Sequence, residues 1–216
     1  MRSSSTSPIP SGCSRRSSTN VANELEVKAV VDAPDGVRAR LLVAGATAGF
    51  TGTMTDRRYD RRGELGRRDE VLRIRRFEHP DGRVEAHLSW KGPTRRTADG
   101  YKQREELEYS MSGAQSPGLL LEQLGYEISH AIDRRVEYFA LGAATLRLEW
   151  YPRMDVLLEV EGPPDAIEAA ITAAGLPREE FGADSLVDFA ARYERRTGAP
   201  AVLAATPATP LPAAAP

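Results

Sequence analysis

The sequence has very little cysteine and histidine and no long apolar run, and each shortage excludes a class of protein or site. Cys13 is the one cysteine among 216 residues, so neither an internal disulfide nor a thiolate zinc site can form. The three histidines are scattered, without the spacing of metal ligands. No stretch approaches the ~20 apolar residues that cross a membrane, and the Ser- and Arg-rich start lacks the apolar segment of a secretory signal. We therefore expect a cytoplasmic protein that does not bind a membrane.

The sequence also lacks an excess of charge of either sign. Its 29 basic and 31 acidic residues leave a net charge of −2, so there is no overall basic field that would attract nucleic acid. Charged residues nevertheless make up 28% of the chain, beside 41% hydrophobic residues that suffice for a core. Abundant but balanced charge favours a site for a metal and an anion over a surface for a nucleic acid duplex.

Composition divides the chain into one domain and two tails. Residues 1–20 are rich in Ser, Pro and Arg, and residues 198–216 in Ala, Pro and Thr. Neither segment has an amphipathic pattern, so both are expected to be disordered and dispensable. The folded domain is expected over residues 21–197, as a monomer or a homodimer.

Eight segments of this domain alternate apolar and polar residues, as β-strands do. They span residues 22–31, 50–60, 70–77, 84–91, 101–111, 127–140, 144–150 and 156–161. Helices are predicted to begin near Pro34, Pro117, Pro163 and Asp184, and 61–69 is expected to be a loop. Because turn residues favour antiparallel pairing, the predicted fold is α+β: an eight-stranded antiparallel β-barrel with helices packed outside.

Most of the predicted strands carry charged residues on one face. The pattern begins at Glu24, Glu26 and Lys28, which alternate with Leu25 and Val27. It recurs at Arg73/Arg75, Lys102/Arg104/Glu106/Glu108, Arg147/Glu149 and Glu159/Glu161. On one strand this would be a solvated edge, but in a closed barrel such faces line the interior while the apolar faces pack against helices. Because carboxylates bind Mg²⁺ or Mn²⁺ and guanidinium groups bind phosphate, the predicted interior suits a polyanion with divalent metal ions.

Taken in chain order, these residues resemble the CYTH family, also called triphosphate tunnel metalloenzymes. The family includes class IV adenylyl cyclases, thiamine triphosphatases and inorganic triphosphatases, and its Glu-x-Glu-x-Lys signature is present at Glu24, Glu26 and Lys28. The other matching motifs are Tyr59-Asp60, Leu72-Arg73-Ile74-Arg75, Lys91-Gly92-Pro93, Arg104-x-Glu106-x-Glu108, Arg135-x-x-Tyr138 and Glu159-x-Glu161-Gly162. The resemblance covers residues 22–195.

The resemblance implies a role for each of these charged residues. Mg²⁺ or Mn²⁺ would be bound by Glu24, Glu26, Glu159 and Glu161. Phosphate oxygens would be bound by Lys28, Arg73, Arg75, Lys91, Arg104 and Arg135, and the sequence leaves open which of Arg134 and Arg135 points inward. Catalytic roles are expected for Lys28, Glu106 and Glu108, with structural ion pairs as the alternative for the two glutamates.

The implied substrate is a small triphosphate: tripolyphosphate, ATP or thiamine triphosphate. Two reactions remain open, namely hydrolysis by water and cyclisation of ATP by its ribose 3′-hydroxyl group. A non-catalytic module that binds polyphosphate or nucleotide is the alternative to an enzyme. The aromatic residues Tyr59, Trp90, Tyr101 and Tyr138 are candidates to stack on a substrate ring, although packing is the commoner role of such residues.

Overall fold

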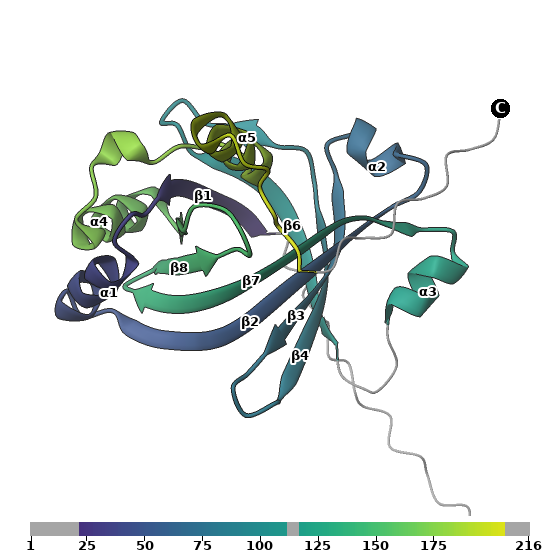
Figure 1. Cartoon of the computed structure of the whole chain (residues 1–216), viewed down its shortest axis with the longest axis horizontal. Helices are drawn as coiled ribbons and strands as arrows, with labels where there is room; N and C mark the ends of the chain where they lie inside the picture. Colours follow the sequence, from purple (N-terminus) through teal and green to yellow (C-terminus); the bar gives the residue numbers. More distant parts are fainter. Residues whose placement is uncertain (1–21, 112–116, 206–216) are drawn as a thin grey trace, which may run out of the picture.

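The strands form one continuous antiparallel sheet that closes into a barrel (Figure 1). The computed structural model describes residues 22–111 and 117–205. Eight strands follow one another in the order β1-β9-β8-β7-β2-β3-β4-β6, and the barrel closes where β1 pairs with β6. The strands are β1 Ala22–Val30, β2 Thr47–Asp60, β3 Val71–Glu78, β4 Val84–Lys91, β6 Lys102–Met111, β7 Glu127–Leu141, β8 Ala144–Trp150 and β9 Leu157–Glu161. This confirms the predicted barrel, to which a two-residue strand, β5 (Arg95–Arg96), is added beside β6.

The helices lie outside the barrel, as predicted, and their ends follow from local sequence. They are α1 Pro34–Val43, α2 Glu64–Arg67, α3 Pro117–Gln123, α4 Pro164–Ala174 and α5 Leu186–Thr197, with a 3₁₀ turn at Arg178–Glu180. Helices α1 and α4 each have Pro in the first turn, where no backbone donor is needed. A capping box of Ser185 and Asp188 begins α5, and Gly198 ends it in the left-handed conformation. Among the described residues, no helix is both long and apolar enough to cross a membrane.

The main hydrophobic core lies outside the barrel wall, between the strands and helices α1 and α4 (Figure 1). Its strand residues, including Val27, Leu146 and Val160, are fully buried, and they meet Leu41 of α1 and Ile171 of α4. A smaller cluster lies under α3. The charged residues that alternate with these apolar positions must therefore point into the barrel.

The segment 61–69, predicted as a loop, contains the short helix α2. The carboxylate of Asp60 explains this, because its Oδ1 accepts hydrogen bonds from the backbone N–H groups of Arg61 (2.6 Å) and Leu65 (3.0 Å). Its Oδ2 accepts a third from Gly66 at 3.0 Å. Asp60 thus satisfies donors that a helix start leaves free, and its role in the Tyr59-Asp60 motif is structural.

Residues 199–205, predicted as part of a disordered tail, lie against the barrel. The backbone N–H of Asp133 in β7 donates to the carbonyl of Leu203 at 2.7 Å. Val202 and Arg153 exchange a pair of backbone hydrogen bonds of 2.8 and 3.1 Å. Because β8 pairs with β7 only from Arg135 onward, this segment covers part of the β7 edge that β8 leaves open. The domain therefore extends to Ala205, while residues 1–20 and the rest of the predicted C-terminal tail lie outside the described residues.

Truncation at Gly198 should destabilise the protein by about 1–3 kcal/mol, because it removes at least three backbone hydrogen bonds to the barrel. Truncation after Ala205 is the matched control, which should melt like the full chain. Thermal unfolding of the three proteins measures the difference. Equal melting temperatures for the two truncated chains would show that the 199–205 segment contributes no stability.

Gly52 allows two strands and an aromatic ring to approach closely. A Cβ atom at this position would lie 2.2 Å from the carbonyl oxygen of Glu78 and 2.8 Å from the ring of Phe50. Gly52→Ala should therefore lower the melting temperature substantially, because backbone atoms would have to move. Gly36→Ala in α1 is the control, since its nearest contact is 3.4 Å and alanine favours helix. A similar effect of both substitutions on thermal unfolding would contradict the predicted close approach.

Candidate functional site: a charged cavity inside the barrel

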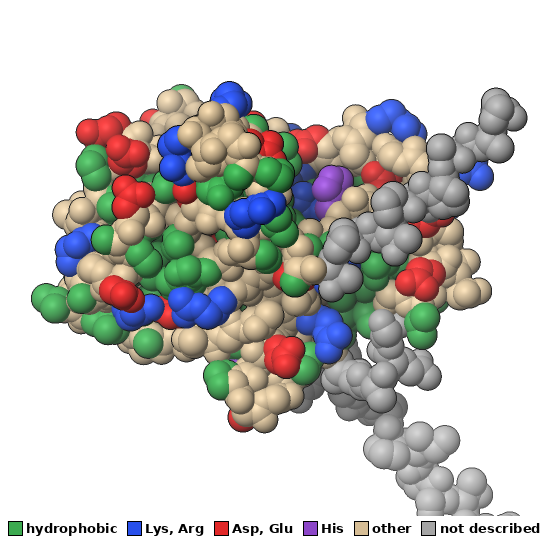
Figure 2. Space-filling model, viewed as in Figure 1, with side chains coloured by type: hydrophobic (Ala, Val, Ile, Leu, Met, Phe, Trp, Pro, Cys, Tyr) green, Lys and Arg blue, Asp and Glu red, His purple; other side chains and the backbone are tan. Residues whose placement is uncertain are grey.

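The barrel holds a cavity of about 520 Å³ whose walls are mostly charged. Nine basic and nine acidic side chains line it, and most come from alternate positions on the strands. The basic residues are Lys28, Arg58, Arg73, Arg75, Lys91, Lys102, Arg104, Arg134 and Arg147. The acidic residues are Glu24, Glu26, Asp56, Asp69, Glu106, Glu108, Glu149, Glu159 and Glu161. By contrast, the outer face in Figure 2 shows charges of both signs scattered among apolar side chains.

All the predicted site residues except Arg135 line this cavity. Arg135 lies on the outer face of β7, where its guanidinium stacks 3.6 Å from the ring centroid of Trp150 and pairs with Glu137 at 2.6 Å. Its neighbour Arg134 points inward instead, because successive residues of a strand face opposite sides. The prediction of Arg135 in the cavity is therefore wrong by one residue.

Four carboxylates from the adjacent strands β1 and β9 line one wall of the cavity. The register places Glu26 opposite Glu161 and Lys28 opposite Glu159. The ammonium group of Lys28 lies 2.8 Å from Glu26 and 2.6 Å from Glu159. Although burial opposes its charge, these two carboxylates raise the pKa of Lys28. The predicted metal ligands are thus brought together, with a lysine between two of them.

Glu161 and Glu24 differ in how well their negative charge is compensated. Burial, together with the neighbouring carboxylates Glu24 and Glu159, raises the pKa of Glu161 to about 8. Burial would also raise the pKa of Glu24, but the ammonium of Lys91 holds it at about 2. With its pKa raised to about 8, the carboxyl of Glu161 is mostly protonated at neutral pH in the metal-free protein.

Three lysines form ion pairs with these carboxylates. Lys91 contacts Glu24 and lies 3.1 Å from Glu106, and Lys102 lies 2.6 Å from Glu26, which also contacts Lys28. Among residues 22–111 and 117–205, no three Asp, Glu, His or Cys side chains are grouped as a ready-made metal site. The donor chemistry still fits a hard divalent cation, because four carboxylates are available and one holds an excess proton.

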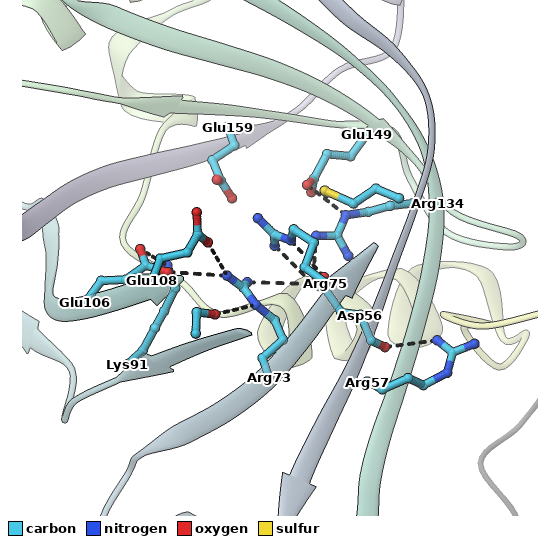
Figure 3. Close-up of polar contacts among 12 residues, drawn as sticks. Asp56, Arg57, Arg73, Arg75, Lys91, Glu106, Glu108, Arg134, Glu149 and Glu159 are labelled. Carbon is cyan, nitrogen blue, oxygen red and sulfur yellow. Dashed lines mark hydrogen bonds and ion pairs between the residues drawn. The ribbon is translucent and has the colours of Figure 1, made fainter. Parts of the chain in front are cut away.

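Asp56 forms the centre of the opposite wall, where three arginines converge on its carboxylate (Figure 3). Arg75 donates two hydrogen bonds, of 2.8 and 3.0 Å, Arg134 donates one of 3.1 Å, and Arg73 lies 3.7 Å away. Asp56 is 1% exposed. Burial would raise its pKa, but Arg75, Arg134 and Arg73 hold the pKa of this carboxyl well below its ordinary value. The carboxylate therefore fixes the arginine side chains in place.

A second chain of ion pairs joins the two walls. Arg147 donates to Glu149 at 2.6 Å and to the hydroxyl of Tyr138 at 2.9 Å, and it also contacts Glu159. Glu149 in turn accepts hydrogen bonds from Arg134 at 3.0 Å and from the hydroxyl of Tyr151 at 2.5 Å. Burial would raise the pKa of Glu149, but the two arginines hold it at about 2. This network links the predicted metal ligands to the arginines.

Two guanidinium nitrogens in the cavity wall have no hydrogen-bond partner within the described part of the chain. They are Nε of Arg58 and Nη1 of Arg134, and both are buried. Burial and the nearby Arg73 and Arg134 lower the pKa of Arg58 to about 10, although Asp56 partly offsets this. Because a buried donor without a partner costs free energy, these two groups indicate a place for an anion.

The predicted catalytic glutamates are held in ion pairs. Glu106 lies 3.3 Å from Arg73, and burial, together with Glu24, raises its pKa despite Lys91. A carboxylate oxygen of Glu108 lies 2.9 Å from Nδ1 of His87, and the other lies 4.0 Å from the guanidinium of Arg73. Both side chains line the cavity, so their geometry is compatible with either a catalytic or a structural role.

Residues at one rim of the cavity are held by backbone groups. Arg104 donates to the carbonyl of Gly92 at 2.6 Å and to the carbonyl of Asp69. The Lys91-Gly92-Pro93 motif thus fixes Arg104 as well as providing Lys91. The first residues of α5, from Ser185 to Val187, complete this rim.

Sequence reasoning assigned no function to several residues of the site. The period-two pattern placed Lys102, Arg147 and Glu149 on the charged faces, but it did not single out Asp56, Arg58 or Tyr151. Asp56 and Arg58 lie two residues apart on β2, so the same pattern could have found them. Among the four candidate stacking residues, only Tyr138 lines the cavity; Tyr59 and Tyr101 pack in the outer clusters.

Comparison with solved structures identifies similar barrels. The chain is similar to a proposed adenylate cyclase from Vibrio parahaemolyticus (TM-score 0.65, 17% identity, covering 77% of this chain and 96% of the other). It is also similar to the PH1819 protein of Pyrococcus horikoshii OT3 (TM-score 0.63, 21% identity, 76% and 96% covered). A third similar structure is HpAC1 of Hippeastrum, a proposed adenylyl cyclase described with a dominant triphosphatase activity (0.54, 13%, 82% and 95%). No protein family model and no curated protein matches the sequence.

These structures confirm the resemblance to the CYTH family as one of fold. Each comparison covers at least 95% of the other chain, so the whole barrel is shared. At 13–21% identity, the likeness establishes the fold alone.

Proposed function

We propose that this protein is a metal-dependent enzyme that cleaves a phosphoanhydride bond of a small triphosphate inside the barrel. One observation carries the proposal: a single cavity combines four carboxylates on one wall with arginines on the other, and two of these arginines have buried donors without a partner in the described part of the chain. Phosphate oxygens would satisfy these donors, because guanidinium groups bind phosphate in a planar, often bidentate way. The names of two similar structures, as adenylate cyclase and as triphosphatase, support this substrate class.

The charge balance of the cavity supports a requirement for metal. Its nine basic side chains face nine acidic ones, so a bare triphosphate would add several uncompensated negative charges. A divalent cation bound by Glu24, Glu26, Glu159 and Glu161 would restore the balance. When bound there, Mg²⁺ or Mn²⁺ would act as a Lewis acid on phosphate oxygens.

The lysines would exchange partners when substrate enters. Lys28, Lys91 and Lys102 contact carboxylates in the metal-free protein, and a triphosphate offers them alternative oxygen partners. Their transfer to phosphate would free the carboxylates for a metal ion. Each ligand should therefore increase the affinity for the other by the same factor, as thermodynamic linkage requires.

The remaining residues would position the phosphates and the nucleophile. Arg73 and Arg75, fixed by Asp56, would bind non-bridging oxygens and stabilise the charge that develops on bond cleavage. Arg104 would bind phosphate oxygens at the rim of the cavity. Glu106, whose pKa is raised, would accept a proton from the attacking water.

Hydrolysis is the reaction that we propose first. It requires only water and a triphosphate, and one similar structure is described with dominant triphosphatase activity. Cyclisation of ATP would use the same cavity with a ribose hydroxyl as nucleophile. A binding module without turnover would need the arginines but not the carboxylate wall, and all four of these carboxylates are present.

Two measurements on the purified protein test the proposal. Product analysis after incubation with tripolyphosphate, ATP or thiamine triphosphate, with Mg²⁺ or Mn²⁺, should show phosphate release. Calorimetric titration of Mn²⁺ should show tighter binding in the presence of a triphosphate than in its absence. Metal-independent triphosphate binding without any product would favour the binding module, and formation of cyclic AMP with pyrophosphate would favour the cyclase.

A further inference from the structure

Five ring-bearing side chains gather at one end of the cavity. They are Phe50 of β2, Phe77 of β3, His79, His87 of β4 and Tyr138 of β7, here named the aromatic end. Phe50 packs edge-on against Phe77 (5.2 Å between ring centroids) and against His79 (4.8 Å). Phe77 packs in the same way against His87 at 5.4 Å. In a chain with only 6% aromatic residues, this is a pronounced concentration.

The aromatic end is not part of a closed core. All five rings are half-buried, and none belongs to the two hydrophobic clusters outside the barrel. Phe77 and Tyr138 line the charged cavity directly. Apolar ring surface that stays accessible in one place is unfavourable unless a ligand covers it.

The aromatic end directly adjoins the arginines that would bind phosphate. Along β3 the inward residues follow in the order Arg73, Arg75, Phe77, and each step of two residues advances about 7 Å. The guanidinium of Arg75 lies over the ring of Phe77, 5.9 Å from its centroid. Tyr138 similarly accepts a hydrogen bond from Arg147. A group attached to a triphosphate chain on these arginines would reach the rings.

The opposite end of β3 has a different character. There Val71 and the α5 residues Leu186 and Val187 line the cavity beside charged side chains. These aliphatic side chains offer no ring face, whereas the aromatic end offers ring faces and edges together with the imidazole of His87, whose Nδ1 is paired with Glu108. The two ends of the cavity therefore differ: one is lined by aromatic rings and the other by aliphatic side chains.

We infer that the aromatic end binds a planar heteroaromatic ring, so that the preferred substrate is an organic triphosphate and not inorganic tripolyphosphate. The inference rests on the proposed function, because the rings adjoin the cavity only where the phosphates would be held. The ring would stack on Phe77, which packs edge-on against Phe50, and its hydrogen-bonding groups would meet His87. The phosphates would extend from Arg75 toward Arg73.

Equilibrium binding of matched ligands tests this inference. ATP and thiamine triphosphate carry a ring, whereas tripolyphosphate and ribose 5-triphosphate do not. The wild-type protein should bind at least one ring-bearing ligand about 3- to 10-fold more tightly than both ligands without a ring, as expected for one or two aromatic contacts. Phe50→Leu and Phe77→Leu should remove this preference and leave the affinity for tripolyphosphate unchanged.

Tyr109→Leu is the matched control, because Tyr109 is an exposed aromatic residue of β6 that does not line the cavity. Thermal unfolding of each variant verifies that it is folded, and Phe50→Leu provides a second variant if Phe77→Leu is not. Equal affinity for ligands with and without a ring would overturn the inference but leave the proposed function standing. An equal loss for all ligands in the Phe variants would also overturn it. Binding of no triphosphate at all would overturn both.

Discussion

Replacing Glu161 with Gln should reduce turnover by orders of magnitude while leaving the metal-free protein folded. Without metal, Glu161 is crowded by Glu24 and Glu159, and burial together with this crowding raises its pKa to about 8. Gln has the same shape and can still hydrogen bond to Glu24, so little is lost. With metal, the substitution removes a charged ligand from the proposed site. Steady-state rates and calorimetric binding of tripolyphosphate, measured together, should show lost turnover with retained anion binding.

The same substitution should change how stability depends on pH. Because the pKa of Glu161 is raised from 4.5 to about 8, the unfolded chain ionises at a lower pH than the folded protein. The metal-free protein therefore loses stability as pH rises between these two values. Gln does not ionise, so the melting temperature of Glu161→Gln relative to wild type should increase over this interval and level off above it. Thermal unfolding in EDTA, from about pH 5 to about pH 9, measures this difference.

Glu159→Gln provides a contrast within the same wall. Glu159 lies 2.6 Å from Lys28 and also pairs with Arg147, so the substitution removes one of the two carboxylate charges that each of these buried cations contacts. This variant should be destabilised even without metal, by about 1–3 kcal/mol. Glu64→Gln, at an exposed pair with Arg61, is the neutral control. Unchanged turnover in both Glu161→Gln and Glu24→Gln would remove the metalloenzyme proposal and favour a binding module.

The period-two pattern predicted most of the fold and the site because a closed barrel leaves each strand only two environments. Leu158 and Val160 must face the helices, so Glu159 and Glu161 must face the cavity. The pattern was less informative in β7. There two arginines are adjacent, and only the pairing register decides that Arg134 lies inside and Arg135 outside.

Other features depend on contacts between distant parts of the chain. Residues 199–205 have the composition of a tail, yet they are fixed because β7 has an unpaired edge near Asp133. Asp56 was missed for a related reason. Its importance comes from three arginines contributed by β3 and β7, and no local pattern records their convergence.

Replacing Asp56 with Asn should destabilise the protein by about 3–5 kcal/mol, because it breaks a buried network by removing one partner. Asp56 is 1% exposed, and it is the shared counter-charge of Arg75, Arg134 and Arg73. Asn has nearly the same shape, but it is neutral, and its amide nitrogen cannot accept a hydrogen bond from a guanidinium. The three cations would then repel one another inside the barrel. Denaturant unfolding of the metal-free protein measures the loss.

Tripolyphosphate should restore much of the stability that Asp56→Asn loses. The freed arginines lie in the same cavity as the unpartnered donors of Arg58 and Arg134, so a polyanion can replace the missing negative charge. A ligand stabilises the folded state more when the folded state binds it more tightly. Because the freed arginines should bind tripolyphosphate more tightly, this ligand should raise the melting temperature of Asp56→Asn more than that of wild type. Asp35→Asn, at an exposed carboxylate paired with Arg38 of α1, controls for a general charge effect. An equal rise in all three proteins would show that the arginines around Asp56 do not bind the phosphate chain.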